Sequence, residues 1–289
     1  MAESKAAFHA GLSGLLGPAA LMVGARLISM AMGIVAIPFL IQYLGSTGFA
    51  AWALLLALAA GISLLDLGAP SIIVRYLAAP AAAGNWPQAR STLGAVWILL
   101  GLSFGAGLMV TLWAAGPLSV WLRLPDTALF AARDAVCIVF VASMLRAFLG
   151  TSTFTLYAAR QFAVTARIFV LQPLLANLAA IMTAWGSGRL DLTLLAYWVA
   201  QLGVLGVNFV ASRERCVPRF DSAARRLPRL REMCAFGLKV RVDQLAQFIN
   251  FQFDKFIIAG FVGLCAVRAR NGLPPHTEQL PTTPRNRQC

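Results

Sequence analysis

The chain is poor in the residues from which most enzyme active sites are built. Its 289 residues include 11 acidic side chains, 2 histidines and 5 cysteines, and charged residues make up only 12%. His9 and His276 belong to no zinc or triad signature, and the cysteines form no CxxC pair and no disulfide-framework spacing. The sequence therefore predicts no metal site, no cofactor and no enzymatic activity, and we interpret the cysteines as unpaired thiols.

Apolar residues are abundant instead, at 59% of the chain, which leaves too little polar surface for a soluble globule of this size. A stretch of about 20 apolar residues is long enough to cross a hydrocarbon core of about 30 Å as a helix. The sequence therefore predicts an all-α integral membrane protein with about seven transmembrane helices. The predicted spans are 18–43, 50–73, 92–115, 128–156, 163–185, 192–212 and 237–263.

The basic residues predict the orientation of these spans. The N-terminus and the connections 74–91, 157–162 and 213–236 are basic, whereas the alternate connections contain only Arg123 and Arg189. By the positive-inside rule, we expect a bacterial inner-membrane protein with a cytoplasmic N-terminus. The net charge of +13 does not predict nucleic-acid binding, because the cations lie at helix ends and in one loop rather than on one face.

We expect four segments along the chain. Residues 1–212 form a six-helix N-terminal lobe. Residues 213–236 form a linker that contains seven arginines and only three acidic residues, and we expect this linker to bind anionic lipids of the inner leaflet. Residues 237–264 form the seventh helix, which begins a second lobe. Aligning 26–48 with 241–263 gives five identities, as a parallel repeat of helices would. From Cys265 the apolar character stops, so we expect 265–289 to be a disordered tail and the chain to be truncated or frame-shifted there.

Charged side chains inside the predicted spans are candidate functional residues, because each costs about 2.5 to 3.5 kcal/mol on insertion. Arg26 and Asp66 both lie about 20 residues from the turn near Ser46, so they share a depth on antiparallel helices. They form either an ion pair that fixes the hairpin or part of a polar cavity. Arg146 lies about 10 residues inside the fourth span without an obvious acidic partner; it contacts an anionic ligand or snorkels to the interface.

Two segments resemble a known family. Residues 26–76 are similar to the start of Wzx-type polysaccharide-biosynthesis flippases, in the multidrug/oligosaccharidyl-lipid/polysaccharide exporter superfamily. Residues 247–263 resemble the seventh helix of that family, with Asp254 and Gly260 in the expected places. The first resemblance depends on Arg26, Pro38, Leu44, Gly45, Gly48, Phe49, the LLDLG of residues 64–68, Arg75 and Tyr76.

The resemblance implies two six-helix lobes around a central cavity that moves undecaprenyl-pyrophosphate-linked oligosaccharide across the inner membrane for O-antigen, capsule or exopolysaccharide synthesis. It implies a polysaccharide polymerase and chain-length machinery as partners, and it implies that this chain is an incomplete form. We expect the substrate to contact Arg26, Asp66, Arg75, Arg146, Arg241 and Asp254.

Three alternatives stay open. The first is a cation-coupled drug or solute exporter of the same superfamily, which the excess of arginines over acids disfavours. The second is a membrane polysaccharide polymerase or acyltransferase, which usually needs a catalytic cluster in a large outer loop, and the outer loops here are short. The third is a fragment whose first lobe folds but does not transport.

Overall fold

The computed structural model describes residues 2–122, 127, 129, 131–220 and 227–261, and every regular element in these ranges is a helix. Among the described residues, five helical segments are long and apolar enough to cross a membrane: Ala20–Asp66, Trp86–Trp121, Ala132–Ala158, Phe162–Ser187 and Leu190–Ala211. The predicted fold class, an all-α membrane protein, is therefore confirmed. The elements are α1 (Ala2–Ile62), the 3-10 helix η1 (Ser63–Asp66), α2 (Ala69–Ala82), α3 (Trp86–Trp121), α4 (Ala132–Ala158), α5 (Phe162–Ser187), α6 (Leu190–Ala211), α7 (Arg213–Cys216) and α8 (Leu227–Phe261).

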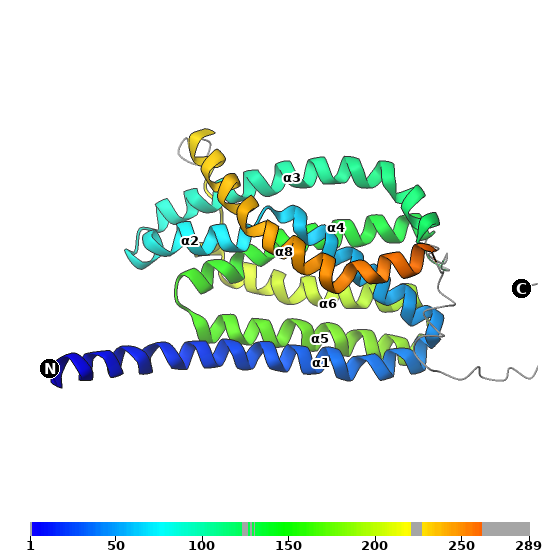
Figure 1. Ribbon diagram of the computed structural model, residues 1–289, viewed down its shortest axis with the longest axis horizontal. Coiled ribbons are helices and arrows are strands. Elements are labelled where there is room, and N and C mark those ends of the chain that lie inside the picture. The colour runs from blue at the N-terminus through cyan, green and yellow to red at the C-terminus, as the bar shows by residue number, and fades with distance from the viewer. Residues whose placement is uncertain (1, 123–126, 128, 130, 221–226, 262–289) are drawn as a thin grey trace, which may run out of the picture.

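The first two predicted spans form one continuous element, α1, which folds back on itself. Gly45 interrupts the helix with φ 72° and ψ 171°, a left-handed conformation that glycine adopts without steric penalty. Figure 1 shows the first arm of α1 running beside α5 and the second arm returning through the bundle. The predicted hairpin and the position of its turn are both confirmed.

The second arm of α1 does not continue to residue 73 as predicted. It ends at Ile62, and after η1 the backbone turns at Leu67 and Gly68, which have φ values of 51° and 72°. The Asp66 carboxylate accepts a hydrogen bond of 2.9 Å from the Gly68 amide, which stabilises this turn. Helix α2 then extends to Ala82, so the connection to α3 is much shorter than the predicted 74–91.

The basic connections gather at one end of the bundle. In Figure 1 the start of α1, the α2–α3 turn, the α4–α5 turn and the end of α6 lie at that end. The Gly45 turn, the α5–α6 turn at Gly188 and the facing ends of α3 and α4 lie at the other end. The arrangement is the one that alternating basic connections predict; that the basic end faces the cytoplasm stays a prediction.

Reporter fusions test this orientation. Alkaline phosphatase fused after residue 85 or 218 is expected to be inactive, because both sites belong to the basic end, whereas a fusion after residue 188 is expected to be active. Green fluorescent protein at the same sites should give the complementary signal. Phosphatase activity of the fusion at residue 85, with none at residue 188, would show that the orientation is the opposite of the predicted one.

Helix α8 differs from the predicted seventh span in two ways. It begins at Leu227, ten residues before the predicted start, so it includes the end of the predicted linker. Within the part of α8 whose side chains the structure describes, 230–249, no segment is among the five that are apolar enough to span a membrane, because polar and charged residues interrupt this stretch. Met233 of α8 is fully buried in a cluster with residues of α2 and α3. The predicted tail, 265–289, lies outside the described residues.

Candidate anion-binding cavity

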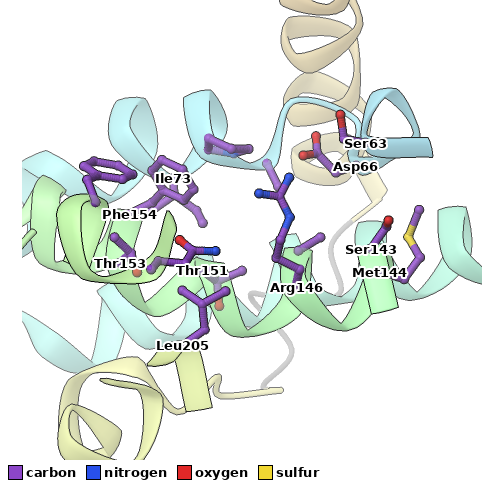
Figure 2. A pocket seen from close by; sticks show the side chains of 16 residues that line it. Ser63, Asp66, Ile73, Ser143, Met144, Arg146, Thr151, Thr153, Phe154 and Leu205 are labelled. Carbon is purple, nitrogen blue, oxygen red and sulfur yellow. The ribbon is translucent and has the colours of Figure 1, made fainter. Parts of the chain in front are cut away.

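A cavity of about 140 Å³ lies inside the helix bundle, where η1 and α2 face α4 (Figure 2). Because a water molecule occupies about 30 Å³ in the liquid, the cavity has room for a head group but not for an oligosaccharide. Its lining comes from five elements: η1, α2, α4, α5 and α6. The lining residues are Ser63, Asp66, Ala69, Pro70, Ile73, Ser143, Met144, Arg146, Ala147, Gly150, Thr151, Thr153, Phe154, Phe169, Gln172 and Leu205.

Arg146 projects from α4 into this cavity towards the η1–α2 segment (Figure 2). The side chain is exposed by its accessible surface, although many protein atoms lie around its guanidinium. Its guanidinium has no hydrogen bond or ion pair to any residue that the structure describes. An unpaired cation inside an apolar bundle is unfavourable, and a guanidinium binds phosphate oxygens through two parallel hydrogen bonds. Arg146 is therefore a candidate ligand for an anion.

Ser143 lies one helical turn before Arg146 and lines the same cavity. It is 5% exposed, and its hydroxyl has no partner among the described atoms. By contrast, the Thr151 hydroxyl accepts a hydrogen bond of 3.2 Å from Trp97 Nε1 and donates one of 2.6 Å to the Phe148 carbonyl. Ser143 and Arg146 thus supply spare donors on one face of α4. The sequence prediction missed Ser143, although its spacing of three residues from Arg146 was a usable signal.

Asp66 is the acidic residue of the lining, and it is already paired. Its carboxylate forms an ion pair with Arg241 of α8, and both side chains are largely buried, at 13% and 12% exposed. The pair neutralises the Asp66 charge, so Arg146 keeps its own charge uncompensated. The site therefore has a net positive charge facing the cavity.

The hypothesis that Arg26 and Asp66 pair is wrong. Arg26 is exposed on the first arm of α1, which packs beside α5, and the partner of Asp66 is Arg241. An equal depth of Arg26 and Asp66 in the membrane was not sufficient for pairing, because η1 places Asp66 towards α8 and away from the first arm of α1. Arg241 comes much later in the chain than Asp66, so the hairpin of the first two predicted spans did not indicate this partner.

The remaining predicted site residues whose side chains the structure describes, Arg26, Arg75 and Arg241, do not line the cavity. Arg75 is exposed and stacks on the ring of Phe236 at 4.3 Å, so it contributes to the contact between α2 and α8. Arg241 forms the ion pair with Asp66 and also donates a hydrogen bond to Gln244. Asp254 lies on α8, but its side chain is outside the part of the structure that is described. Of the predicted set, the cavity brings together Asp66 and Arg146.

Helix α8 docks on the turn that carries Asp66. The backbones of Gly68 and Gly237 approach so closely that a Cβ on Gly68 would lie 3.0 Å from the Gly237 carbonyl oxygen. Tyr76 donates a hydrogen bond of 2.9 Å to Glu232. Partial burial raises the pKa of the Tyr76 phenol, and the bond to Glu232 raises that pKa further. These contacts fix the end of α8 that positions Arg241.

The described residues contain no group of three His, Cys, Asp or Glu side chains that would hold a metal ion. The class that the fold and the cavity define is an α-helical membrane protein with a cationic internal site. No family model, curated protein or solved structure matches the chain.

A double-mutant cycle tests the ion pair. Asp66→Asn and Arg241→Gln are each expected to destabilise the protein, because each leaves a largely buried charge without its partner. The two effects should be non-additive, with a coupling of about 1 to 3 kcal/mol in thermal or denaturant unfolding. The control cycle, Asp66→Asn with Arg26→Gln, should be additive. Additive effects in the first cycle would contradict the pair.

Proposed function

We propose that this protein binds the pyrophosphate head of an undecaprenyl-linked oligosaccharide and takes part in its transfer across the inner membrane of a bacterium. The observation that carries the proposal is Arg146, a guanidinium without a partner among the described residues, in a cavity within membrane-spanning helices. Ser143, whose hydroxyl has no partner among the described residues, adds a second donor on the same face of α4.

The chemistry of such a lipid fits this site. A pyrophosphate is strongly anionic, so it needs cationic and hydrogen-bonding partners to leave the aqueous interface, whereas its isoprenoid tail stays in the hydrocarbon. Transfer requires no covalent step and no catalytic group. Because the cavity is about 140 Å³, we expect the head group to bind at Arg146 while the sugars lie beyond the cavity in this conformation.

The resemblance to Wzx-type flippases supports the same proposal. Its LLDLG motif, residues 64–68, forms the η1 turn at the cavity, where it supplies Asp66 and the left-handed Leu67 and Gly68. The alternative of a cation-coupled exporter needs a carboxylate that is free to bind a cation. Asp66 does not offer one, because Arg241 neutralises it.

Binding of the lipid head group tests the proposal without requiring a full transport cycle. The purified 289-residue chain is incubated in detergent with undecaprenyl pyrophosphate or with uncharged undecaprenol, and the bound lipid is measured by native mass spectrometry. A preference of at least about tenfold for the pyrophosphate is expected, which corresponds to about 1.4 kcal/mol. Equal retention of the two lipids would contradict the proposal. Proteoliposomes with a fluorescent lipid-linked oligosaccharide then measure transfer.

A further inference from the structure

The outer face of α5 borders two apolar grooves. The first, of about 610 Å³, lies between the first arm of α1 and α5, and includes Gly24, Ala25, Ala166 and Arg167. The second, of about 800 Å³, lies between α5 and α6 and includes Leu175, Met182 and Gly203. Leu171 lines both grooves, so they meet on α5. Figure 1 shows α1, α5 and α6 as neighbours in this part of the bundle.

Arg167 is the charged residue at this junction. It is exposed, and no described residue forms a hydrogen bond or an ion pair with its guanidinium. It lies five residues after Phe162, the first residue of α5, so it is about 7.5 Å inside the helix at the basic end of the bundle. At that depth a lipid phosphate group is the available counter-ion for an arginine on the outer surface.

The apolar walls of the grooves match hydrocarbon chains. Leu171, Leu175, Leu178 and Met182 are 41% to 53% exposed along one side of α5. Phe169 and Gln172, by contrast, line the Arg146 cavity. The two sites therefore lie on different sides of α5, and the grooves need an occupant that is apolar along α5 and anionic at Arg167.

We infer that Arg167 and the two grooves form a binding site for an anionic diacyl phospholipid. The phosphate binds the Arg167 guanidinium, one acyl chain lies in the α1–α5 groove, and the other lies in the α5–α6 groove. The charge of Arg167 selects an anionic lipid over a zwitterionic one, and two grooves that meet at Leu171 match two chains that leave one glycerol. This site does not depend on the proposed function, because it shares no lining residue with the Arg146 cavity.

The charge requirement is tested with the full chain in nanodiscs of equal parts phosphatidylglycerol and phosphatidylcholine, followed by native mass spectrometry. We expect phosphatidylglycerol to be retained in preference to phosphatidylcholine. Arg167→Gln should lower that retention at least about fivefold, since it removes a charged hydrogen bond to phosphate, and Arg167→Lys should preserve part of it. The matched control is Arg26→Gln, because Arg26 is another exposed arginine at a similar depth and lines neither groove.

The grooves are tested by filling them. A Cβ added at Gly24 or Gly203 would meet no atom within 4 Å, so Gly24→Leu and Gly203→Leu should fold and place a side chain where an acyl chain lies. Both variants should reduce phosphatidylglycerol retention. Gly33→Leu and Gly206→Leu are the controls, because these glycines are equally open but line neither groove. Circular dichroism verifies that all four variants keep their helix content.

The inference would be overturned by equal retention of the two lipids by the wild-type chain, by equal losses for Arg167→Gln and Arg26→Gln, or by no effect of the two groove-filling leucines. Displacement of the lipid by millimolar inorganic phosphate would show a simple phosphate site and would also overturn it. Arg146→Ala should leave phosphatidylglycerol retention unchanged, and Arg167→Gln should leave the preference for undecaprenyl pyrophosphate unchanged. The two proposals therefore fail independently.

Discussion

Replacing Gly237 with alanine is expected to detach α8 from the turn that carries Asp66. A Cβ at this position would overlap the Leu67 carbonyl oxygen and lie 2.9 Å from Ile72 Cδ1. The opposing backbone has little freedom to move, because Leu67 and Gly68 hold left-handed conformations with φ values of 51° and 72°. Overpacking of this kind destabilises a protein by about 1 to 3 kcal/mol or more.

Thermal unfolding in detergent measures this effect, and limited trypsin digestion reports whether α8 is released. We expect Gly237→Ala to lower the melting temperature by several degrees and to speed cleavage at the arginines that precede and follow the start of α8. Gly33→Ala and Gly206→Ala are matched controls, since a Cβ at either position meets open space. A Gly237→Ala protein that melts and digests like the wild type would show that α8 is not held at this contact.

The parts of the fold that local signals determine could be predicted from the sequence. Apolar runs of sufficient length identified the five helical segments that can cross a membrane, although they also predicted a seventh span in α8 that is not among these five in the described residues. The alternation of basic connections identified which helix ends lie together. Gly45 was a recognisable turn residue between two apolar runs. The η1 break and the early start of α8 were not predictable in this way, because Leu67 adopts its left-handed conformation where α8 packs against it.

In the site, too, local signals predicted some features, whereas features that depend on tertiary packing were not predicted. Arg146 was identified because a lone charge in an apolar span needs a partner or a ligand, and the structure places it in a cavity. The partner of Asp66 was not predicted correctly, because its ion pair with Arg241 depends on the packing of α8 against the η1 turn, which the sequence pattern does not indicate. Ser143 was missed because a serine inside a membrane helix usually bonds to the preceding turn. Only the structure shows that its hydroxyl lacks such a bond.

Arg146→Ala is expected to abolish the preference for undecaprenyl pyrophosphate over undecaprenol. A charge-assisted hydrogen bond contributes about 1.5 to 3 kcal/mol, so losing it should weaken binding by about tenfold to a hundredfold. Arg146→Lys should restore part of the affinity, because lysine keeps the charge but loses the bidentate geometry of the guanidinium. Ser143→Ala should cause a smaller loss. Arg133→Ala is the control, since Arg133 is exposed on the same helix and lines no part of the cavity.

Stability separates a binding role of Arg146 from a structural one. If the guanidinium held the helices together, Arg146→Ala would lower the melting temperature of the empty protein. No described residue pairs with the guanidinium, however, and an uncompensated charge within the membrane is unfavourable. The alanine variant should therefore be at least as stable as the wild type while it loses the lipid. A variant that melts early, or one that still prefers the pyrophosphate, would remove Arg146 from the proposed site.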